Sequence, residues 1–318
     1  MTACCASNRK RFRDVLAIRN PVILGSGPPG HSAKGLVRYG QYAGAVVSKS
    51  ITFLPRKGNP HPRVVSLGNF GLINWENLPN PGYKRFADEL RAAKAQCKCP
   101  VIASLGPSHN IDELRTMALS FEEAGADALE LNFKWGFDPN TGQTRYNMQA
   151  GKEGFESTSI FEIIVTLKKA VSIPIIAKLA ALAGDLVNNA KAAESAGADA
   201  ITAINTIFPA MKIDITRQKP ALSTCFGGLS GKSILPLSVA TVYRIYEAVN
   251  IPIIGCGGVT SGEDALEMIM AGADAVQICT AAMVEGPSVF RRINDEINTL
   301  VKGIGFGSVN ECRGVAHL

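Results

Sequence analysis

Four polar residues come at the ends of short apolar runs, where their side chains could together form one functional site. They are Lys49, Asn132, Lys178 and Asn205. An ammonium group stabilises a neighbouring negative charge, and a carboxamide offers a hydrogen-bond donor and an acceptor together. A single lysine could equally reach solvent, and a single asparagine could equally occupy a turn. Because all four follow apolar runs, we interpret them as parts of one site.

Three glycine-rich segments are typical of phosphate binding. They are Phe226–Gly231, Gly255–Gly258 and the strand end Gln277–Ala281 with its threonine, Thr280. Backbone N–H groups beside small residues can approach a phosphate closely, and the loops after the last strands of a barrel commonly bind one. A glycine pair alone is more often a turn. The prediction of a phosphate site therefore depends on all three segments reaching the same rim.

The elements that would position these residues repeat along the chain. Pro21, Pro100, Pro174 and Pro252 each open a short apolar run, as expected of buried strands, because proline is tolerated at a strand's first residue. Ala-Gly-Ala-Asp-Ala occurs at 124–128, 196–200 and 271–275, and Tyr42–Val47 has a similar form. The glycine in each indicates a helix end that leads into a strand. The two kinds of segment alternate, which gives eight strands.

This alternation predicts an α/β fold of the (β/α)₈ TIM barrel type, a single domain over residues 1–318 with 1–19 as an N-terminal extension. Helical patterns fill the gaps at 83–97, 111–123, 158–170, 184–196, 235–249, 261–271 and 287–302. The loops after strands 2 and 4, residues 50–82 and 133–157, are long enough to be binding loops. A doubly wound open sheet is the alternative, but no G-x-G-x-x-G follows the first strand.

Composition excludes several classes of protein. The chain is 46% hydrophobic and 19% charged, as expected of a globular protein. Its net charge of +6 is scattered, so we expect no nucleic-acid partner. The eight cysteines form no C-x-x-C pair, so we expect no metal site and reduced thiols in the cytoplasm. No apolar stretch approaches the ~20 residues of a membrane span, and lipidation of Cys4 and Cys5 is the alternative route to a membrane.

Taken in order, these motifs resemble the FMN-dependent dihydroorotate dehydrogenases and the related pyrimidine-reducing part of dihydropyrimidine dehydrogenase. The resemblance runs from about Asn20 to the C-terminus. The segments that carry it are Asn20-Pro21-Val22, Val47-Ser48-Lys49-Ser50-Ile51-Thr52, Gly58-Asn59-Pro60-His61-Pro62-Arg63, Leu129-Glu130-Leu131-Asn132, Ala177-Lys178-Leu179, Ala203-Ile204-Asn205-Thr206, Gly227-Gly228-Leu229-Ser230-Gly231, Gly255-Cys256-Gly257-Gly258 and Gln277-Ile278-Cys279-Thr280-Ala281.

The resemblance implies FMN across the barrel mouth and hydride exchange between flavin N5 and a CH–CH bond, or a C=N bond, of a cyclic amide or pyrimidine-like substrate, as in pyrimidine metabolism. The implied cofactor residues are Ser26, Gly27, Ser48, Lys49, Asn132, Lys178, Asn205, Gly228, Ser230, Gly231, Gly257, Gly258, Cys279 and Thr280. The implied substrate residues are Lys49, Asn69, Gly71, Leu72, Asn74, Asn132, Asn205 and Thr206. A homodimer and a separate electron-transfer partner are also expected.

The chain departs from the family pattern at the position of the base. Where the family has a cysteine or serine that removes the substrate proton, this chain has Trp135, and Lys134 precedes it. Gly68 stands where a substrate asparagine is expected. We therefore expect Lys49, Lys134 and Trp135 to form an atypical catalytic set, and dihydroorotate to be turned over more slowly than is usual for the family. Asp138, Arg145 and Tyr146 are further acid/base residues to consider by their position in the same loop.

Two other functions compete with this interpretation. The first is a flavin-binding protein with lost or non-redox activity, against which the retained Lys49 and Asn205 argue. The second is a flavin-free barrel isomerase acting on a sugar phosphate, since the glycine segments would bind any phosphate.

Overall fold

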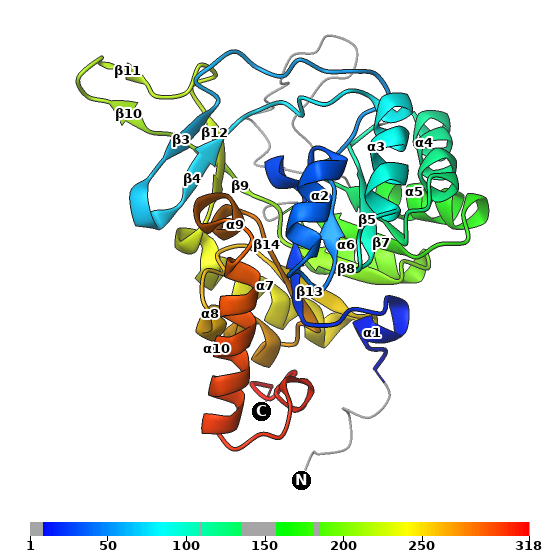
Figure 1. The fold of residues 1–318 in the computed structure, drawn as a ribbon, viewed down its shortest axis with the longest axis vertical. Coiled ribbons are helices and arrows are strands. Elements are labelled where there is room, and N and C mark those ends of the chain that lie inside the picture. Colours follow the sequence, from blue (N-terminus) through cyan, green and yellow to red (C-terminus); the bar gives the residue numbers. More distant parts are fainter. Residues whose placement is uncertain (1–8, 109, 135–156, 181–184, 318) are drawn as a thin grey trace.

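A closed barrel of eight parallel strands forms the centre of the computed structural model, which describes residues 9–108, 110–134, 157–180 and 185–317 (Figure 1). The strands are β1 (Val22–Leu24), β2 (Val46–Val47), β5 (Val101–Leu105), β6 (Ala128–Asn132), β7 (Ile175–Leu179), β8 (Ala200–Ala203), β13 (Ile253–Cys256) and β14 (Ala275–Ile278). β14 pairs with β1 through Val22 and Val276, which closes the ring. The predicted (β/α)₈ barrel is confirmed.

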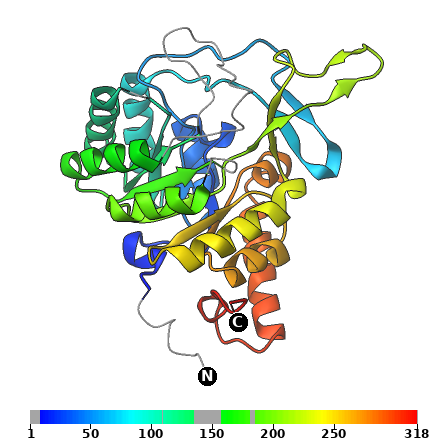
Figure 2. The ribbon, with the colours of Figure 1, turned by 180° about the vertical axis from the view of Figure 1, so that it is seen from behind.

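Helices cover the outside of the barrel, as Figures 1 and 2 show from opposite sides. They are α2 (Ala33–Gly40), α3 (Tyr83–Lys94), α4 (Ile111–Glu123), α5 (Ser157–Ala170), α6 (Leu186–Ser195), α7 (Leu235–Ala248), α8 (Gly262–Met270), α9 (Thr280–Glu285) and α10 (Val289–Gly303). Side chains cap several N-termini, for example Asn110 on α4 and Ser261 on α8, and so satisfy backbone N–H groups that lack a helical partner. Within the described residues, no helix is long and apolar enough to cross a membrane.

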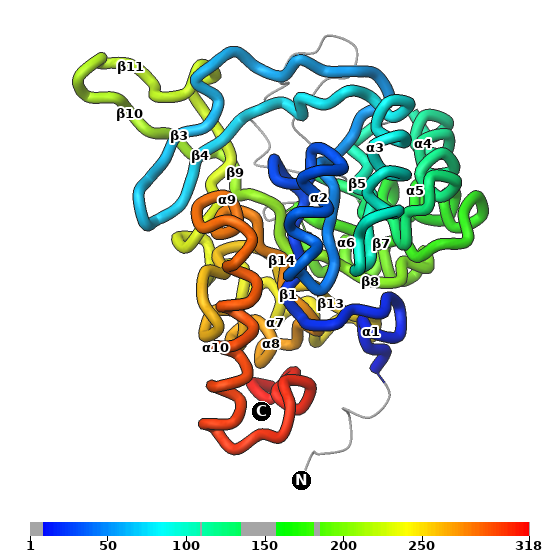
Figure 3. Tube along the Cα trace, viewed as in Figure 1, coloured from blue at the N-terminus to red at the C-terminus, as the bar shows by residue number. Residues whose placement is uncertain are grey.

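The N-terminal extension predicted from the sequence closes the barrel at the amino ends of its strands. Phe12 and Leu16, in and just after the short helix α1 (Phe12–Val15), are 1% and 7% exposed. They pack against the innermost layer of barrel residues, which includes Ile23, Ile102 and Ile176. Burying a phenylalanine or leucine side chain contributes roughly 1.5–3 kcal/mol. In Figure 3 the blue trace runs from α1 into β1, so this plug is continuous with the first strand.

A second, antiparallel sheet lies beside the barrel at the carboxyl ends of its strands. Its order is β3 (Val64–Ser66), β4 (Leu72–Asn74), β12 (Gly227–Ser230) and β9 (Ile207–Ala210). The loop after β2 supplies its first two strands and the loop after β8 supplies the others, with a further hairpin of β10 (Ile213–Asp214) and β11 (Lys219–Pro220). The sequence predicts only a long loop for residues 50–82. The sheet therefore holds the long connections after β2 and β8 in fixed positions beside the barrel.

Candidate active site

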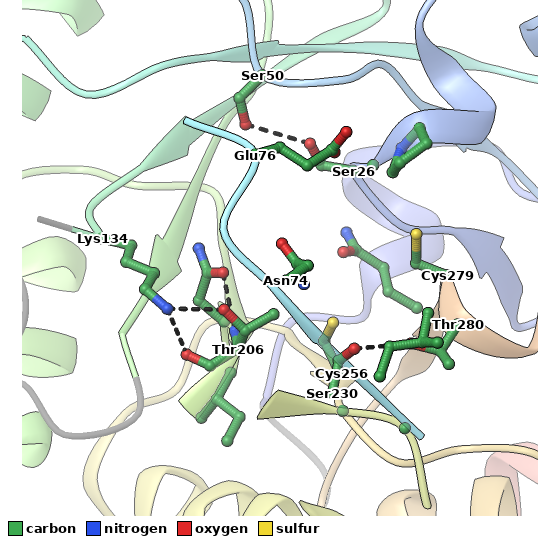
Figure 4. Close-up of a pocket in the computed structure, with 18 of the residues that line it drawn as sticks. Ser26, Ser50, Asn74, Glu76, Lys134, Thr206, Ser230, Cys256, Cys279 and Thr280 are labelled. Carbon is green, nitrogen blue, oxygen red and sulfur yellow. Dashed lines mark hydrogen bonds between the residues drawn. The ribbon is translucent and has the colours of Figure 1, made fainter. Parts of the chain in front are cut away.

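A cavity lies at the carboxyl ends of the barrel strands, bounded on one side by β4 and β12 of the second sheet (Figure 4). Most of the residues predicted from the sequence line it. They are Ser26, Gly27, Lys49, Leu72, Asn74, Asn132, Lys134, Lys178, Asn205, Thr206, Ser230, Gly231, Gly257, Gly258, Cys279 and Thr280. Parallel strands bring their carboxyl ends to one face of a barrel, which is why residues so far apart in the chain meet here.

The structure places four predicted contact residues away from the cavity lining, namely Ser48, Asn69, Gly71 and Gly228. Ser48 is buried, and its hydroxyl accepts a hydrogen bond from the Ser104 N–H at 2.9 Å. Asn69 is exposed in a 3₁₀ turn. The two glycines allow close packing: a Cβ on Gly71 would lie 1.9 Å from the Ser230 carbonyl oxygen. Trp135 lies outside the described residues.

A buried polar network forms the floor of the cavity. Lys178 Nζ donates to Gln277 Oε1 at 2.9 Å and lies 3.4 Å from Glu130 Oε1. Gln277 Nε2 and Thr202 Oγ1 both donate to Glu130 Oε2, at 2.6 and 3.1 Å. Burial by itself would lower the pKa of Lys178, but its interactions with the ionisable groups of Cys256, Glu130 and Cys279, in that order of size, outweigh burial and raise that pKa. The floor therefore presents a charged ammonium group to the cavity.

Two cysteine thiols lie next to this floor. Burial raises the pKa of Cys256, and burial raises the pKa of Cys279 to about 12. At neutral pH both thiols therefore keep their protons. Because the thiolate is the reactive form of cysteine, neither thiol is a ready base or nucleophile.

Hydrogen bonds between side chains fix the amides of the cavity wall. Asn205 Nδ2 donates to Asn132 Oδ1 at 3.0 Å, and Asn132 Nδ2 donates to Ser50 Oγ at 3.2 Å. Asn205 Oδ1 in turn accepts from the Thr206 N–H at 2.8 Å. Each carboxamide thus donates one of its two N–H groups to another side chain of the wall. The arrangement fixes which way each amide faces, as the recognition of a cyclic amide requires.

Lys134 extends along the same wall, directly after β6. Its Nζ donates to Thr206 Oγ1 at 2.6 Å and to the Thr206 carbonyl oxygen at 2.7 Å (Figure 4). The same nitrogen lies 5.8 Å from the ring centroids of both Trp75 and Phe208, whose centroids are 4.6 Å apart with the rings tilted by 36°. Cation–π contacts of this length stabilise a charged ammonium. Lys134 is therefore positioned as a fixed positive charge at the cavity edge.

The opposite end of the cavity is suited to a phosphate. Ser230 Oγ accepts a hydrogen bond from Thr280 Oγ1 at 3.0 Å, and Gly231, Gly257 and Gly258 line the same end. Gly257 and Gly258 have φ values of +117° and +89°, which glycine adopts without strain. Among the described lining residues, no carboxylate lies in this group to repel an anion.

An ion pair at the cavity edge joins Lys49 to a residue that the sequence analysis missed. Lys49 Nζ donates to Glu76 Oε2 at 2.8 Å, and the side chains are only 8% and 17% exposed. Arg63 Nε lies 3.6 Å from the other carboxylate oxygen. Glu76 follows Asn74 by two residues, and alternate residues of an extended chain face the same side. That spacing is the signal that could have identified it.

These features define an enzyme of the TIM-barrel class, with amide, ammonium and phosphate-compatible groups around one cavity. The sequence profile of the family described as dihydroorotate dehydrogenase matches residues 14–301. The chain therefore belongs to the dihydroorotate dehydrogenase family, and it is an oxidoreductase acting on CH–CH bonds.

Relatives with curated names cover nearly the whole chain. A protein of Methanothermobacter thermautotrophicus named dihydroorotate dehydrogenase B (NAD(+)), catalytic subunit, is 40% identical over 309 residues, covering 95% of this chain and 96% of that one. The protein of the same name from Pyrococcus abyssi is 39% identical over 302 residues, with coverage of 95% and 96%. A crystal structure of the Eimeria tenella DHODH in complex with ferulenol has a TM-score of 0.75 at 22% identity, covering 93% of this chain and 85% of that one. The Eimeria tenella protein is therefore similar to this chain in fold.

Proposed function

We propose that the protein is an FMN-dependent dehydrogenase for a six-membered cyclic amide that carries a carboxylate, with dihydroorotate as its substrate. The observation that carries the proposal is the placement of Lys134 beside the amides of Asn132 and Asn205. The amides match the ring N–H and C=O groups of a dihydropyrimidine, and the ammonium matches a carboxylate on it.

The cavity also suits FMN. The Ser230 and Thr280 hydroxyls and the glycines at 231, 257 and 258 would hold the phosphate. Apolar side chains, among them Ile204 and Val259, would contact a flat ring, and Lys178 would face it from the cavity floor. When bound, FMN supplies a two-electron acceptor for hydride. The rim offers one phosphate site and no second site for an adenosine half among the described lining residues, so we propose FMN and not FAD.

The chain's own residues would orient the substrate and balance its charge. Asn74, Asn132 and Asn205 would hold the ring by its amide groups, and Lys134 would bind the carboxylate. Lys49, with its ammonium at the cavity edge, would stabilise negative charge as it develops on the ring that receives the electrons. The slow dihydroorotate turnover expected from the sequence depended on Trp135 at the position of the base and on Gly68 in place of a substrate asparagine. The positive charge of Lys134 and the names of the relatives favour dihydroorotate instead.

We also propose a separate electron-transfer subunit, because the two relatives reported above carry the name dihydroorotate dehydrogenase B (NAD(+)), catalytic subunit. The homodimer stays a prediction, which sedimentation of the purified protein would test.

A pair of substrates tests the proposed function. The purified protein should contain FMN, identified by mass after release, and dihydroorotate should bleach its absorbance faster than dihydrouracil, which lacks the carboxylate. Lys134→Met should raise KM for dihydroorotate by about 10- to 100-fold, as expected from losing a hydrogen bond to a charged group, and leave the reaction with dihydrouracil unchanged. Lys57→Met, at an exposed site, is the matched control. Protein that takes up no FMN, or that binds FMN and is reduced by neither compound, would contradict the proposal.

A further inference from the structure

We propose that Glu76 is the proton acceptor of the reaction, a role that rests on the proposed function and replaces the base missing at position 135. Glu76 lines the cavity two residues after Asn74, and Figure 4 shows both side chains leaving the same segment of chain beside the cavity. Its partner Lys49 also lines the cavity, so the carboxylate lies among the groups that would contact the ligand.

The other titratable groups of the cavity lining are poor proton acceptors at neutral pH. The three lysines act as ammonium donors, from Lys49 to Glu76, from Lys134 to Thr206 and from Lys178 to Gln277. The thiols of Cys256 and Cys279 stay protonated because burial raises the pKa of each. Among the lining residues that the structure describes, Glu76 is thus the one acidic side chain. It can take a proton without first losing one.

The surroundings of Glu76 hold its carboxylate in place and leave one oxygen less committed. Asn59 fixes the backbone, because its N–H donates to the Glu76 carbonyl oxygen at 2.9 Å and its Nδ2 donates to the Trp75 carbonyl oxygen at 2.8 Å. Glu76 Oε2 accepts from Lys49 at 2.8 Å, whereas Oε1 lies 3.6 Å from Arg63 Nε, beyond hydrogen-bond distance. Oε1 is therefore the oxygen we assign to proton transfer.

The proposed step conserves atoms and electrons. The C–H bond next to the ring carbonyl of the dihydropyrimidine breaks, and its proton forms an O–H bond with Glu76 Oε1. The electron pair left behind becomes the new C=C bond, while the neighbouring carbon gives up its hydrogen as hydride to FMN, the two-electron oxidant of the proposed function. Glu76 later returns the proton to solvent. A positioned acid or base of this kind typically contributes 10²–10⁴-fold to the rate.

Glu76→Gln tests this role, because the amide keeps the size of the side chain and cannot take the proton. We expect anaerobic flavin reduction by dihydroorotate to slow by about 10²–10⁴-fold, with FMN affinity and reduction by dithionite unchanged. Glu76→Asp should recover part of the rate. The matched control, Glu263→Gln at an exposed site on α8, should keep the wild-type rate.

Isotope effects separate proton transfer from positioning. In Glu76→Gln, deuterium at the carbon that loses the proton should slow reduction more strongly than in the wild type. A merely structural role would leave this isotope effect unchanged. Wild-type reduction rates in Glu76→Gln would overturn the Glu76 assignment alone. A wild-type protein that binds FMN and is not reduced by dihydroorotate would overturn the proposed function itself.

Discussion

Lys178 and Glu130 form an ion pair inside the barrel, with Lys178 Nζ 3.4 Å from Glu130 Oε1 and side-chain exposures of 6% and 0%. The two residues come from adjacent strands, β7 and β6, whose register places Lys178 opposite Asn132 and Ile176 opposite Glu130. Glu130 therefore lies one layer below Lys178, where it holds the ammonium at the cavity floor. The charge that faces the cavity thus depends on a carboxylate that does not line it.

Glu130→Gln should destabilise the protein by about 3–5 kcal/mol, because removing one partner leaves the other charge buried and uncompensated. The double variant Glu130→Gln with Lys178→Met should regain a large part of this loss. Urea unfolding of the three proteins measures the difference. A free energy of unfolding for Glu130→Gln within about 1 kcal/mol of the wild-type value would contradict the importance of the pair.

Gly258→Ala should lower both thermal stability and FMN affinity. Its φ is +89°, and a Cβ there would lie 2.5 Å from the Leu235 backbone at the start of α7, so the phosphate end of the cavity would have to shift. Gly286→Ala is a matched control, because Gly286 also has positive φ, +79°, and no heavy atom within 4 Å of an added Cβ. Thermal unfolding and FMN titration should show the larger loss for Gly258→Ala. Equal losses in the two variants would show that backbone strain alone, and not the close approach to Leu235, causes the effect.

The raised pKa of the half-buried Cys279 thiol should make stability fall at alkaline pH. Its pKa is raised from 9.0 in the unfolded chain to about 12, so between these values the folded state holds a proton that the unfolded state has lost. The free energy of unfolding therefore decreases as pH rises through this window, and the effect is absent below about pH 9. Urea unfolding at pH 8 and pH 10 should show a smaller decrease for Cys279→Ala than for the wild type. Parallel decreases would contradict the raised pKa.

Lys49→Ala should slow flavin reduction by dihydroorotate and leave the fold intact. Removing one preorganised charged group typically costs about 2.7–4 kcal/mol of transition-state stabilisation, or about 10²–10³-fold in rate. The loss should be at the upper end, because the Glu76 carboxylate would remain at the cavity edge without its 2.8 Å partner. Stopped-flow kinetics give the rate, and circular dichroism checks the fold. Wild-type kinetics in this variant would show that Lys49 does not act on the reaction.

The barrel could be predicted because each strand carries its own local signal. A proline-opened apolar run or an Ala-Gly-Ala-Asp-Ala turn marks seven of the strands, and the similar segment Tyr42–Val47 marks β2. All of these signals depend on nearby residues. The second sheet carries no such signal. β4 has three residues, and its pairing joins Leu72 to Ser230 across a long stretch of chain. The plug formed by Phe12 was missed for the same reason, since a helix of four residues shows no period.

Site residues at the ends of barrel strands could be predicted from the sequence, whereas a site residue inside a long loop could not. Lys49, Asn132 and Lys178 follow apolar runs, so the barrel geometry brings them together. Glu76 lies in the loop after β4, and its spacing of two residues from Asn74 is a weak signal in the sequence. The three-dimensional contact with Lys49, 27 residues earlier, is what distinguishes it clearly.

Anaerobic mixing of the FMN-bound protein with dihydroorotate tests the central claim most directly. We expect the flavin absorbance to bleach in the wild type within the time of one turnover, and to bleach about 10²–10⁴-fold more slowly in Glu76→Gln, because the cavity supplies both a binding site for the carboxylate and a proton acceptor. Flavin that stays oxidised in the wild type, in protein that binds FMN and folds normally, would contradict the account.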